Sequence, residues 1–259
     1  MKIIKYLKLW LKTTNLSLQM RIMTRGASLM YLVGKLIRFL FFLIMLFVIL
    51  GQTKTLAGYN QQQIIIFFLI FNLVDIIGQL FFRGIYFFRN EVVSGHFDLT
   101  LVKPANALFQ ILTVQTDLLD TPLLVIMLFL FIKQGIKITF INFLLFLLIF
   151  GASFLIITAI HIIIASIGVI TTEVDNAIWI YRDLSLMAKV PVDIYIDWIR
   201  SMFTFILPIA VIFTFPAKAL LGILSWQWII YSLIISVILF YISLKFWHFA
   251  LTRYTSASS

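Results

Sequence analysis

Cysteine is missing from this 259-residue chain, and charged residues are scarce, at 12%. The absence of cysteine excludes disulfides, thiolate metal sites and cysteine nucleophiles. Only three histidines occur, far apart and without the spacing of metal ligands, so we expect no metal site: His96, His161 and His248. Soluble domains carry about 25% charged residues. This chain therefore lacks the polar surface that would cover it in water.

Hydrophobic residues make up 63% of the chain, and the mean hydropathy is +1.10. They come in runs, such as 39–50 and 64–71. A helix needs about 20 mostly apolar residues to cross a bilayer, and several segments reach that length. The runs lack the alternation that a membrane barrel needs. We therefore predict an all-α integral membrane protein in which residues 1–259 form a single transmembrane domain.

Six membrane-spanning helices are expected, at roughly 30–50, 62–82, 107–132, 140–167, 202–215 and 226–246. Lys35 and Arg38 lie near the start of the first span, where their long side chains are expected to snorkel to the headgroups. The fifth span is short and is interrupted by Pro208.

The N-terminal 25 residues predict an amphipathic helix rather than a signal peptide. Lysines recur every three or four residues on one side, and apolar residues fill the other side: Lys2, Lys5, Lys8 and Lys12 against Ile3, Ile4, Leu7 and Leu11. Such a helix lies at the membrane surface. A simple basic tail is the alternative.

The 20 Lys and Arg residues are distributed unevenly between the two sides. With six spans and the N-terminus inside, only four lie outside: Lys54, Lys133, Lys137 and Lys218. Basic residues concentrate in cytoplasmic loops, so both termini are expected in the cytoplasm, together with the polar segments 83–105 and 171–200. The net charge of +10 is thus explained by topology, and no nucleic-acid partner is expected.

Motifs for catalysis are also lacking. The sequence contains no G-x-x-x-x-G-K-[S/T] phosphate loop, no H-E-x-x-H and no Ser-His-Asp arrangement. We therefore expect a transport or scaffold subunit rather than an enzyme.

The segment 94–104 reads S-G-H-F-D-L-T-L-V-K-P and is followed by Leu108-Phe109-Gln110. It resembles the loop G-x-[L/F]-D-x-x-L-x-[K/R]-P that follows the second span in membrane permeases of type 2 ABC exporters. The Gly58-Tyr59 step and a second set of residues also fit that family: Pro191, Tyr195, Arg200, Phe205, Pro208, Pro216, Ala217 and the Leu-Leu-Gly at 220–222. The resemblance covers nearly the whole chain in order and spacing.

The resemblance implies partners. Two permeases, identical or sister chains, form the pathway, and each binds a cytoplasmic ABC ATPase subunit that holds ATP and Mg. The permease sits in the cell (plasma or inner) membrane and exports a small amphipathic or hydrophobic substrate, as in multidrug efflux. Drugs, lipids, peptides and organic cations are all compatible. A scaffold subunit without a transport path and a secondary transporter are the alternatives; the latter often shows an internal repeat, and none is evident here.

The 83–105 loop is the expected coupling site. Residues 90–93 predict a short helix that Gly95 stops, and the resemblance implies that seven residues contact the ATPase: Glu91, Ser94, Gly95, Phe97, Asp98, Lys103 and Pro104. A loop that only connects two spans is the alternative. A second contact is expected from four residues, with a solvated polar face as the alternative: Glu173, Asp175, Arg182 and Asp183.

Polar residues inside the spans are candidates for the substrate pathway. Asn72, Asp75 and Gln79 share one face of the second span, and Asp117 and Asp120 are i, i+3 neighbours in the third. An ionisable residue at bilayer depth costs roughly 3 kcal/mol on insertion scales. The alternatives are a helix–helix hydrogen bond or subunit contact for the first group, and a position near the headgroups for the two aspartates. His161 is expected to be a packing residue.

Overall fold

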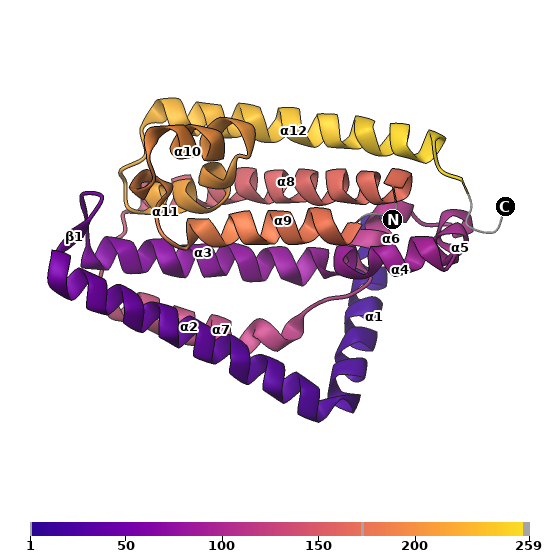
Figure 1. Ribbon diagram of the computed structural model, residues 1–259, viewed down its shortest axis with the longest axis horizontal. Coiled ribbons are helices and arrows are strands. Elements are labelled where there is room, and N and C mark those ends of the chain that lie inside the picture. The colour runs from indigo at the N-terminus through magenta and orange to yellow at the C-terminus, as the bar shows by residue number, and fades with distance from the viewer. Residues whose placement is uncertain (1, 172–173, 256–259) are drawn as a thin grey trace.

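The computed structural model describes residues 2–171 and 174–255. These residues form a long helical bundle (Figure 1), with a small hairpin at one end and both chain termini near the other. We call these the hairpin end and the loop end. The elements up to the middle of the chain are α1 (Lys2–Met23), α2 (Arg25–Thr53), β1 (Thr55–Leu56), β2 (Tyr59–Asn60), α3 (Gln61–Phe82), η1 (Arg83–Phe87), α4 (Phe88–Val93), α5 (His96–Val102), α6 (Ala107–Thr113), η2 (Leu118–Asp120) and α7 (Thr121–Lys133).

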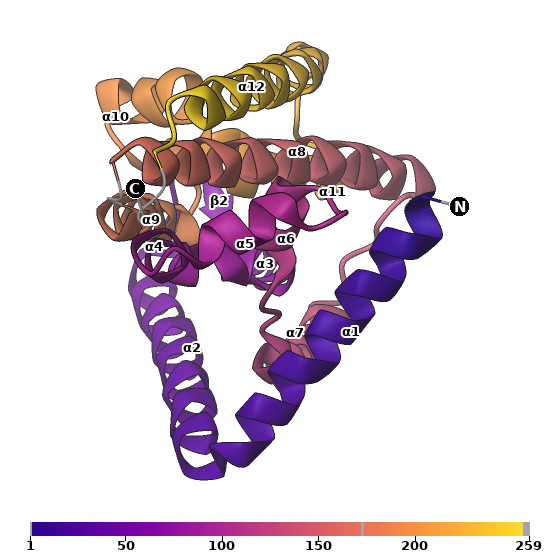
Figure 2. The same cartoon turned by 90° about the vertical axis from the view of Figure 1, so that its right-hand side faces the viewer.

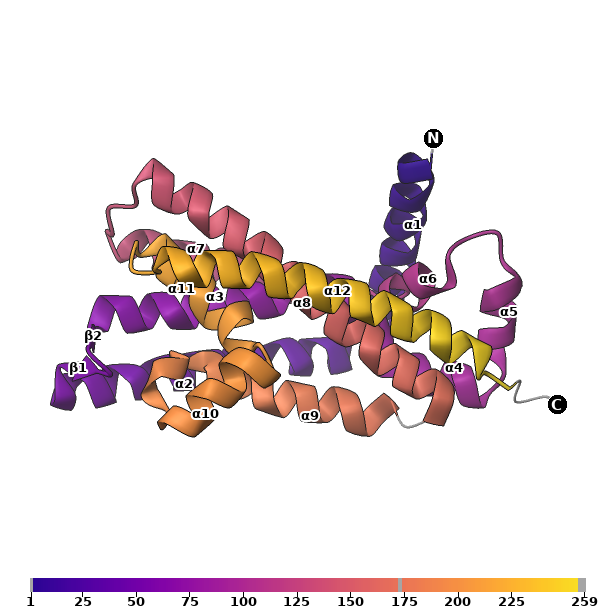
Figure 3. The same ribbon diagram turned by 90° about the horizontal axis from the view of Figure 1, so that it is seen from above.

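The second half continues in the same bundle. Its elements are α8 (Phe140–Thr171), α9 (Val174–Leu186), η3 (Met187–Lys189), η4 (Val192–Ile194), α10 (Asp197–Ser201), η5 (Met202–Ile206), η6 (Ala210–Thr214), α11 (Phe215–Leu220) and α12 (Trp226–Thr252). The longest of these, α8, has α12 packed along it (Figure 3).

The N-terminal helix α1 lies across the loop end, at a steep angle to the bundle axis (Figures 1 and 2). Its apolar residues Ile4, Leu7 and Leu11 are exposed. Its other face touches the bundle, where the Trp10 and Phe81 rings stack at 5.3 Å. A helix is therefore present where the lysine spacing predicted one, and its position at the membrane surface stays a prediction.

The central helix is α3, which begins with a capping box. The Asn60 side chain accepts a hydrogen bond from the backbone amide of Gln63, and the Gln63 side chain accepts one from the backbone amide of Asn60, both at 2.9 Å. In its most apolar stretch 67% of residues are buried, against 17% in α2 and 17% in α12. The bundle is therefore built around α3, with α2 and α12 at its periphery.

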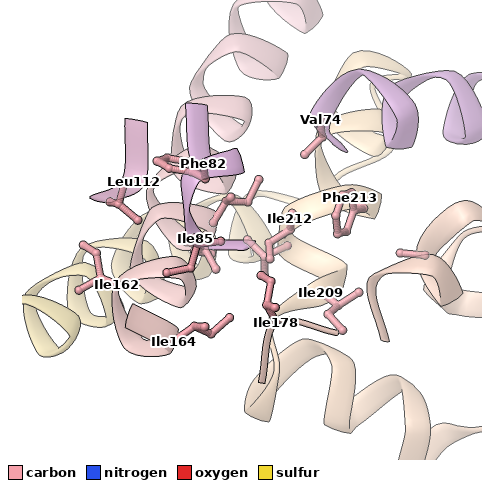
Figure 4. Close-up of a cluster of buried hydrophobic side chains, with 14 of the residues drawn as sticks. Val74, Phe82, Ile85, Leu112, Ile162, Ile164, Ile178, Ile209, Ile212 and Phe213 are labelled. Atoms are coloured by element: carbon pink, nitrogen blue, oxygen red, sulfur yellow. The ribbon is translucent and has the colours of Figure 1, made fainter. Parts of the chain in front are cut away.

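The main core joins α3 to the second half of the chain (Figure 4). Val74 and Phe82 of α3 pack with Ile178 of α9 and with Ile212 and Phe213 of η6. A second hydrophobic cluster joins the opposite side of α3 to α2 and α7.

Four helices are long and apolar enough to cross a membrane, and two bent helix pairs bring the number of candidate spans to six at most. The described part of the chain is thus an all-α, multi-pass membrane protein. The first bent pair corresponds to the predicted third span, which is broken at 114–117 and bent by 40° rather than continuous. Pro122 lies in the first turn of α7, where its missing amide hydrogen leaves no helical hydrogen bond unmade.

The segment 171–200 differs from the prediction, which put it on the same side as the 83–105 loop. Residues 174–194 instead run along α3 from the loop end to the hairpin end. Arg182 pairs with Asp75 midway, and Asp193 accepts a hydrogen bond from the Tyr59 hydroxyl of the hairpin at 3.1 Å. Glu173 lies outside the described residues.

The predicted fifth span, 202–215, is not a straight crossing. Residues 197–206 and 210–220 form two short helical pieces bent by 84° at Pro208. Phe205 in the first piece and Phe215 in the second both contact the Trp228 ring, with centroids at 6.0 and 5.4 Å. Because Trp228 is in the first turn of α12, both pieces lie at the hairpin end, and the chain turns back there.

Candidate functional site

The polar residues predicted in α3 lie on one face of that helix and line a single cavity of about 50 Å³. The Gln79 side-chain amide donates a hydrogen bond to Asp75 Oδ2 at 2.8 Å, and the Asn72 side-chain amide donates one to the Phe68 carbonyl at 2.7 Å. Asp120 reaches the same cavity from η2. A space of this size has room for a few water molecules but not for a large substrate.

Asp75 forms an ion pair with Arg182 of α9. Both Nη atoms of the guanidinium point at the carboxylate, and each side chain is 17% exposed. A two-point Arg–carboxylate contact is directional as well as strong. It fixes α9 against α3, which is the helix–helix interaction that the sequence offered as the alternative role of Asp75.

Asp117 and Asp120 lie inside the bundle, each only 1% exposed. The Lys35 ammonium donates to both Asp120 oxygens at 2.6 Å and lies 3.8 Å from Asp117 Oδ2. Asp117 also accepts from the Tyr31 hydroxyl at 3.2 Å and lies 3.7 Å from Arg83 Nε. The break at 114–117 turns both aspartates into the bundle, and their position near the headgroups stays a prediction.

Three bases of this site were not identified from the sequence: Lys35, Arg83 and Arg182. Lys35 does not snorkel, since its side chain is 11% exposed and paired. Arg182 was assigned to a cytoplasmic segment and instead lies inside the bundle. One signal was available, because three aspartates at span depth require nearby bases.

His161 is a packing residue, as predicted. Its ring packs against Phe82 at 5.0 Å and against Tyr181 at 5.5 Å, and its Nδ1 lies 2.8 Å from the Ile157 carbonyl. Within 2–171 and 174–255, no three His, Asp or Glu residues cluster in a way that suits a metal ion.

The 83–105 loop folds into short helices at the loop end. The helix expected at 90–93 is present as α4, and Gly95 follows with a φ of +75°, a left-handed conformation that glycine adopts without strain. The turn redirects the chain into α5, so the loop is a compact helical corner rather than an extended connection.

The residues implied as ATPase contacts divide into two groups. Glu91, Ser94, Lys103 and Pro104 are exposed. Phe97 is fully buried, with its ring 5.3 Å from Phe88 and 5.0 Å from Tyr254.

Asp98 is half-buried and accepts a hydrogen bond from the Tyr254 hydroxyl at 2.9 Å. Burial, together with the hydrogen bond to Asp98 and its charge, raises the pKa of Tyr254 to about 12. Phe97 and Asp98 thus attach α5 to the end of α12, and Gly95 supplies the turn.

The outer surface of the loop carries apolar side chains that the sequence reading did not single out. Val93 and Leu99 are exposed, and Val102 is 80% exposed. Figure 1 shows α4 and α5 at the loop end of the bundle. We call Val93, Leu99 and Val102 the apolar loop face.

These features define a class of protein: a multi-pass, all-α membrane protein with paired charges at span depth and a structured loop at one end. A family profile described as ABC-2 family transporter protein matches residues 36–258. The chain therefore belongs to the ABC-2 family of transporter proteins, as a membrane component. No curated protein and no solved structure gave a significant match.

Proposed function

We propose that this chain is the permease subunit of an ABC exporter and that a separate ATPase binds to its 83–105 loop. The observation that carries the proposal is the apolar loop face. Exposed apolar patches outside a membrane mark binding surfaces, and this one lies in the loop whose sequence resembles the coupling loop of the family. The exposed Glu91 and Lys103 add charged contacts at its rim.

The loop is suited to transmit force. Phe97 and Asp98 attach it to α12, and α1 attaches its end, where the Lys5 ammonium donates to the Pro104 carbonyl at 2.6 Å. A partner that pushes on α5 therefore moves long helices of the bundle rather than a loose connection.

The charge distribution supports a cytoplasmic position for the loop end. In the structure Arg200 lies at the hairpin end, and several paired bases lie inside the bundle. Basic residues still concentrate at the loop end: Lys5, Lys8, Lys12, Arg25, Arg89, Lys103, Lys245 and Arg253. The positive-inside rule then places both termini in the cytoplasm. In this proposal six crossings are made by α2, α3, α6 with α7, α8, residues 174–194 and α12.

The pathway for a small amphipathic or hydrophobic substrate is proposed to form between this chain and a second permease, identical or related, in the cell membrane. Asn72, Asp75, Gln79, Asp117 and Asp120 are its candidate polar lining. The cavity that most of them share is too small to enclose a whole substrate in the described state, so transport requires the rearrangement that ATP binding to the partner supplies. ATP and Mg belong to that partner.

The test is affinity purification of the tagged chain from gently solubilised native membranes, with mass spectrometry and an ATPase assay. We expect an ABC ATPase to co-purify, and Val102→Glu to reduce its recovery about tenfold, because burial of that charge against an apolar partner surface costs more than 1.4 kcal/mol. Lys54→Glu, at the hairpin end, is the matched control and should leave recovery unchanged. Recovery of the chain without an ATPase in several mild detergents would favour a scaffold or a secondary transporter instead.

A further inference from the structure

The charges around the polar cavity do not balance. Each buried carboxylate has a base: Asp75 has Arg182, Asp120 has Lys35, and Asp117 lies between Lys35 and Arg83. Two more cations line the same cavity, Arg38 from α2 and Lys189 from η3. Within the described ranges neither forms an ion pair with a carboxylate. Five bases and three acids leave a formal surplus of two positive charges around the cavity, and of the two spare cations Arg38 is exposed.

Two other cavities show no such surplus. At the hairpin end a larger cavity of about 450 Å³ also contains two bases, Arg200 and Lys218. Each of these is paired, Arg200 with Asp197 and Lys218 with Asp193 at 2.8 Å. A third cavity of about 360 Å³, between α3, α7 and α8, is lined by apolar residues alone.

An unpaired cation at bilayer depth is unfavourable unless it reaches an anion or water. Lys189 is half-buried, and its ammonium lies 4.9 Å from the centre of the Phe42 ring. Phe42 is one helical turn beyond Arg38 on α2, so both spare cations lie on the α2 side of the cavity. An anion placed there would meet a charge from α2 and a charge from η3.

Apolar surface surrounds this position. Four phenylalanines line the cavity from α2 and α3: Phe39, Phe42, Phe68 and Phe71. The outer face of α2 carries exposed apolar residues on both sides of Arg38, including Ile37, Phe41 and Ile44. A cavity of about 50 Å³ accommodates a charged headgroup but not a tail, whereas α2 offers an apolar strip along which a tail can lie.

We infer that this cavity binds the anionic headgroup, a phosphate or a carboxylate, of an amphiphile whose apolar tail lies along α2, and that such amphiphiles are the substrate class. The binding site stands on the charges and the cavity alone; the substrate assignment rests on the proposed permease function. The same headgroup chemistry belongs to a resident membrane lipid and to a transported amphiphile.

Binding is tested on the purified chain in an uncharged detergent by native mass spectrometry. The probes are oleoyl lysophosphatidic acid, which is anionic, and oleoyl lysophosphatidylcholine, which has the same tail and no net charge. We expect the anionic probe to bind at least tenfold more tightly. Lys189→Gln and Arg38→Gln should each weaken its binding about tenfold, as expected for the loss of one charge-assisted contact.

Two variants separate charge from folding. Lys189→Arg keeps the charge and should keep the binding. Lys133→Gln removes a lysine whose ammonium also lies 4.9 Å from a phenylalanine ring, that of Phe129, but away from the cavity, and it should change nothing. Equal affinity for the two probes, or equal weakening by Lys133→Gln and Lys189→Gln, overturns the inference.

A second experiment separates the two sources of the headgroup. The chain is co-purified with its ATPase, reconstituted into vesicles and supplied with ATP and Mg and a fluorescent anionic lysophospholipid. ATP-driven movement of this lysophospholipid across the vesicle membrane supports the substrate class if Lys189→Gln abolishes it. Selective binding without ATP-driven movement overturns the substrate class and leaves a resident-lipid site. If an ATPase co-purifies with the chain but the chain does not bind the anionic probe selectively, this inference is overturned and the proposed function stands.

Discussion

The Asp75–Arg182 pair allows the buried charges to be tested quantitatively. Asp75→Asn removes the charge that compensates Arg182 and weakens the contact from Gln79. Breaking a buried pair by removing one partner costs about 3–5 kcal/mol. Both side chains are 17% exposed beside a cavity with room for a few water molecules, which reduces the expected cost to about 2–3 kcal/mol. For a chain of this size that corresponds to a fall in Tm of roughly 4–12 °C.

The assay is thermal unfolding of the purified chain in detergent, run as a double-mutant cycle with Arg182→Gln. Each single variant leaves one buried charge without its partner. The free energy of unfolding lost by the double variant should therefore be about 2 kcal/mol smaller than the sum of the losses of the two single variants. Asp197→Asn is the control, because the Arg200–Asp197 pair is exposed and such pairs contribute little. Additive single effects, or an Asp75→Asn shift no larger than that of Asp197→Asn, would refute the assignment of a buried, coupled pair.

Two further predictions concern packing at the loop end. Gly84→Ala would place a Cβ 2.2 Å from the Ile111 carbonyl oxygen, so the free energy of unfolding should fall by at least about 2 kcal/mol in the same thermal assay. Gly26→Ala is the control, because a Cβ there meets no other atom within 4 Å, and it should be neutral or slightly stabilising. Tyr254→Phe removes the hydrogen bond to Asp98, worth about 1 kcal/mol, so the amides of 96–102 should exchange about fivefold faster; unchanged exchange would show that Phe97 alone holds α5.

Local sequence signals predicted the local structure well. The lysine spacing predicted the amphipathic helix at the N-terminus, and Gly95 predicted the end of the short helix in the loop. In α3, the i, i+3, i+7 spacing placed Asn72, Asp75 and Gln79 on one face, and the structure puts them in one cavity. These features depend on helical periodicity and backbone conformation, which neighbouring residues determine.

The charged segment 174–194, which crosses the membrane in the proposed arrangement, could not be predicted in the same way. Residues 174–194 contain Arg182, Lys189 and Asp193, so hydropathy excluded them from the spans. Their neighbour 202–215 was chosen instead because it is apolar. Arg182 is tolerated inside the bundle because Asp75, 107 residues away, is its partner. A hydropathy window does not register a partner at that distance, and the same reason explains why Lys35 was expected to snorkel.

The family match begins at residue 36, beyond the whole of α1 and the first turns of α2. Nevertheless α1 contacts residues well inside the matched region. The Tyr6 hydroxyl accepts a hydrogen bond from the backbone amide of Asn106. The Thr14 hydroxyl forms a hydrogen bond with the hydroxyl of Thr116, which lies in the break before α7. A version of the protein trimmed to the matched residues would lose these supports for the junction between the 83–105 loop and the broken span. Substitutions in the first 35 residues can therefore alter how firmly this junction is held without changing the matched region itself.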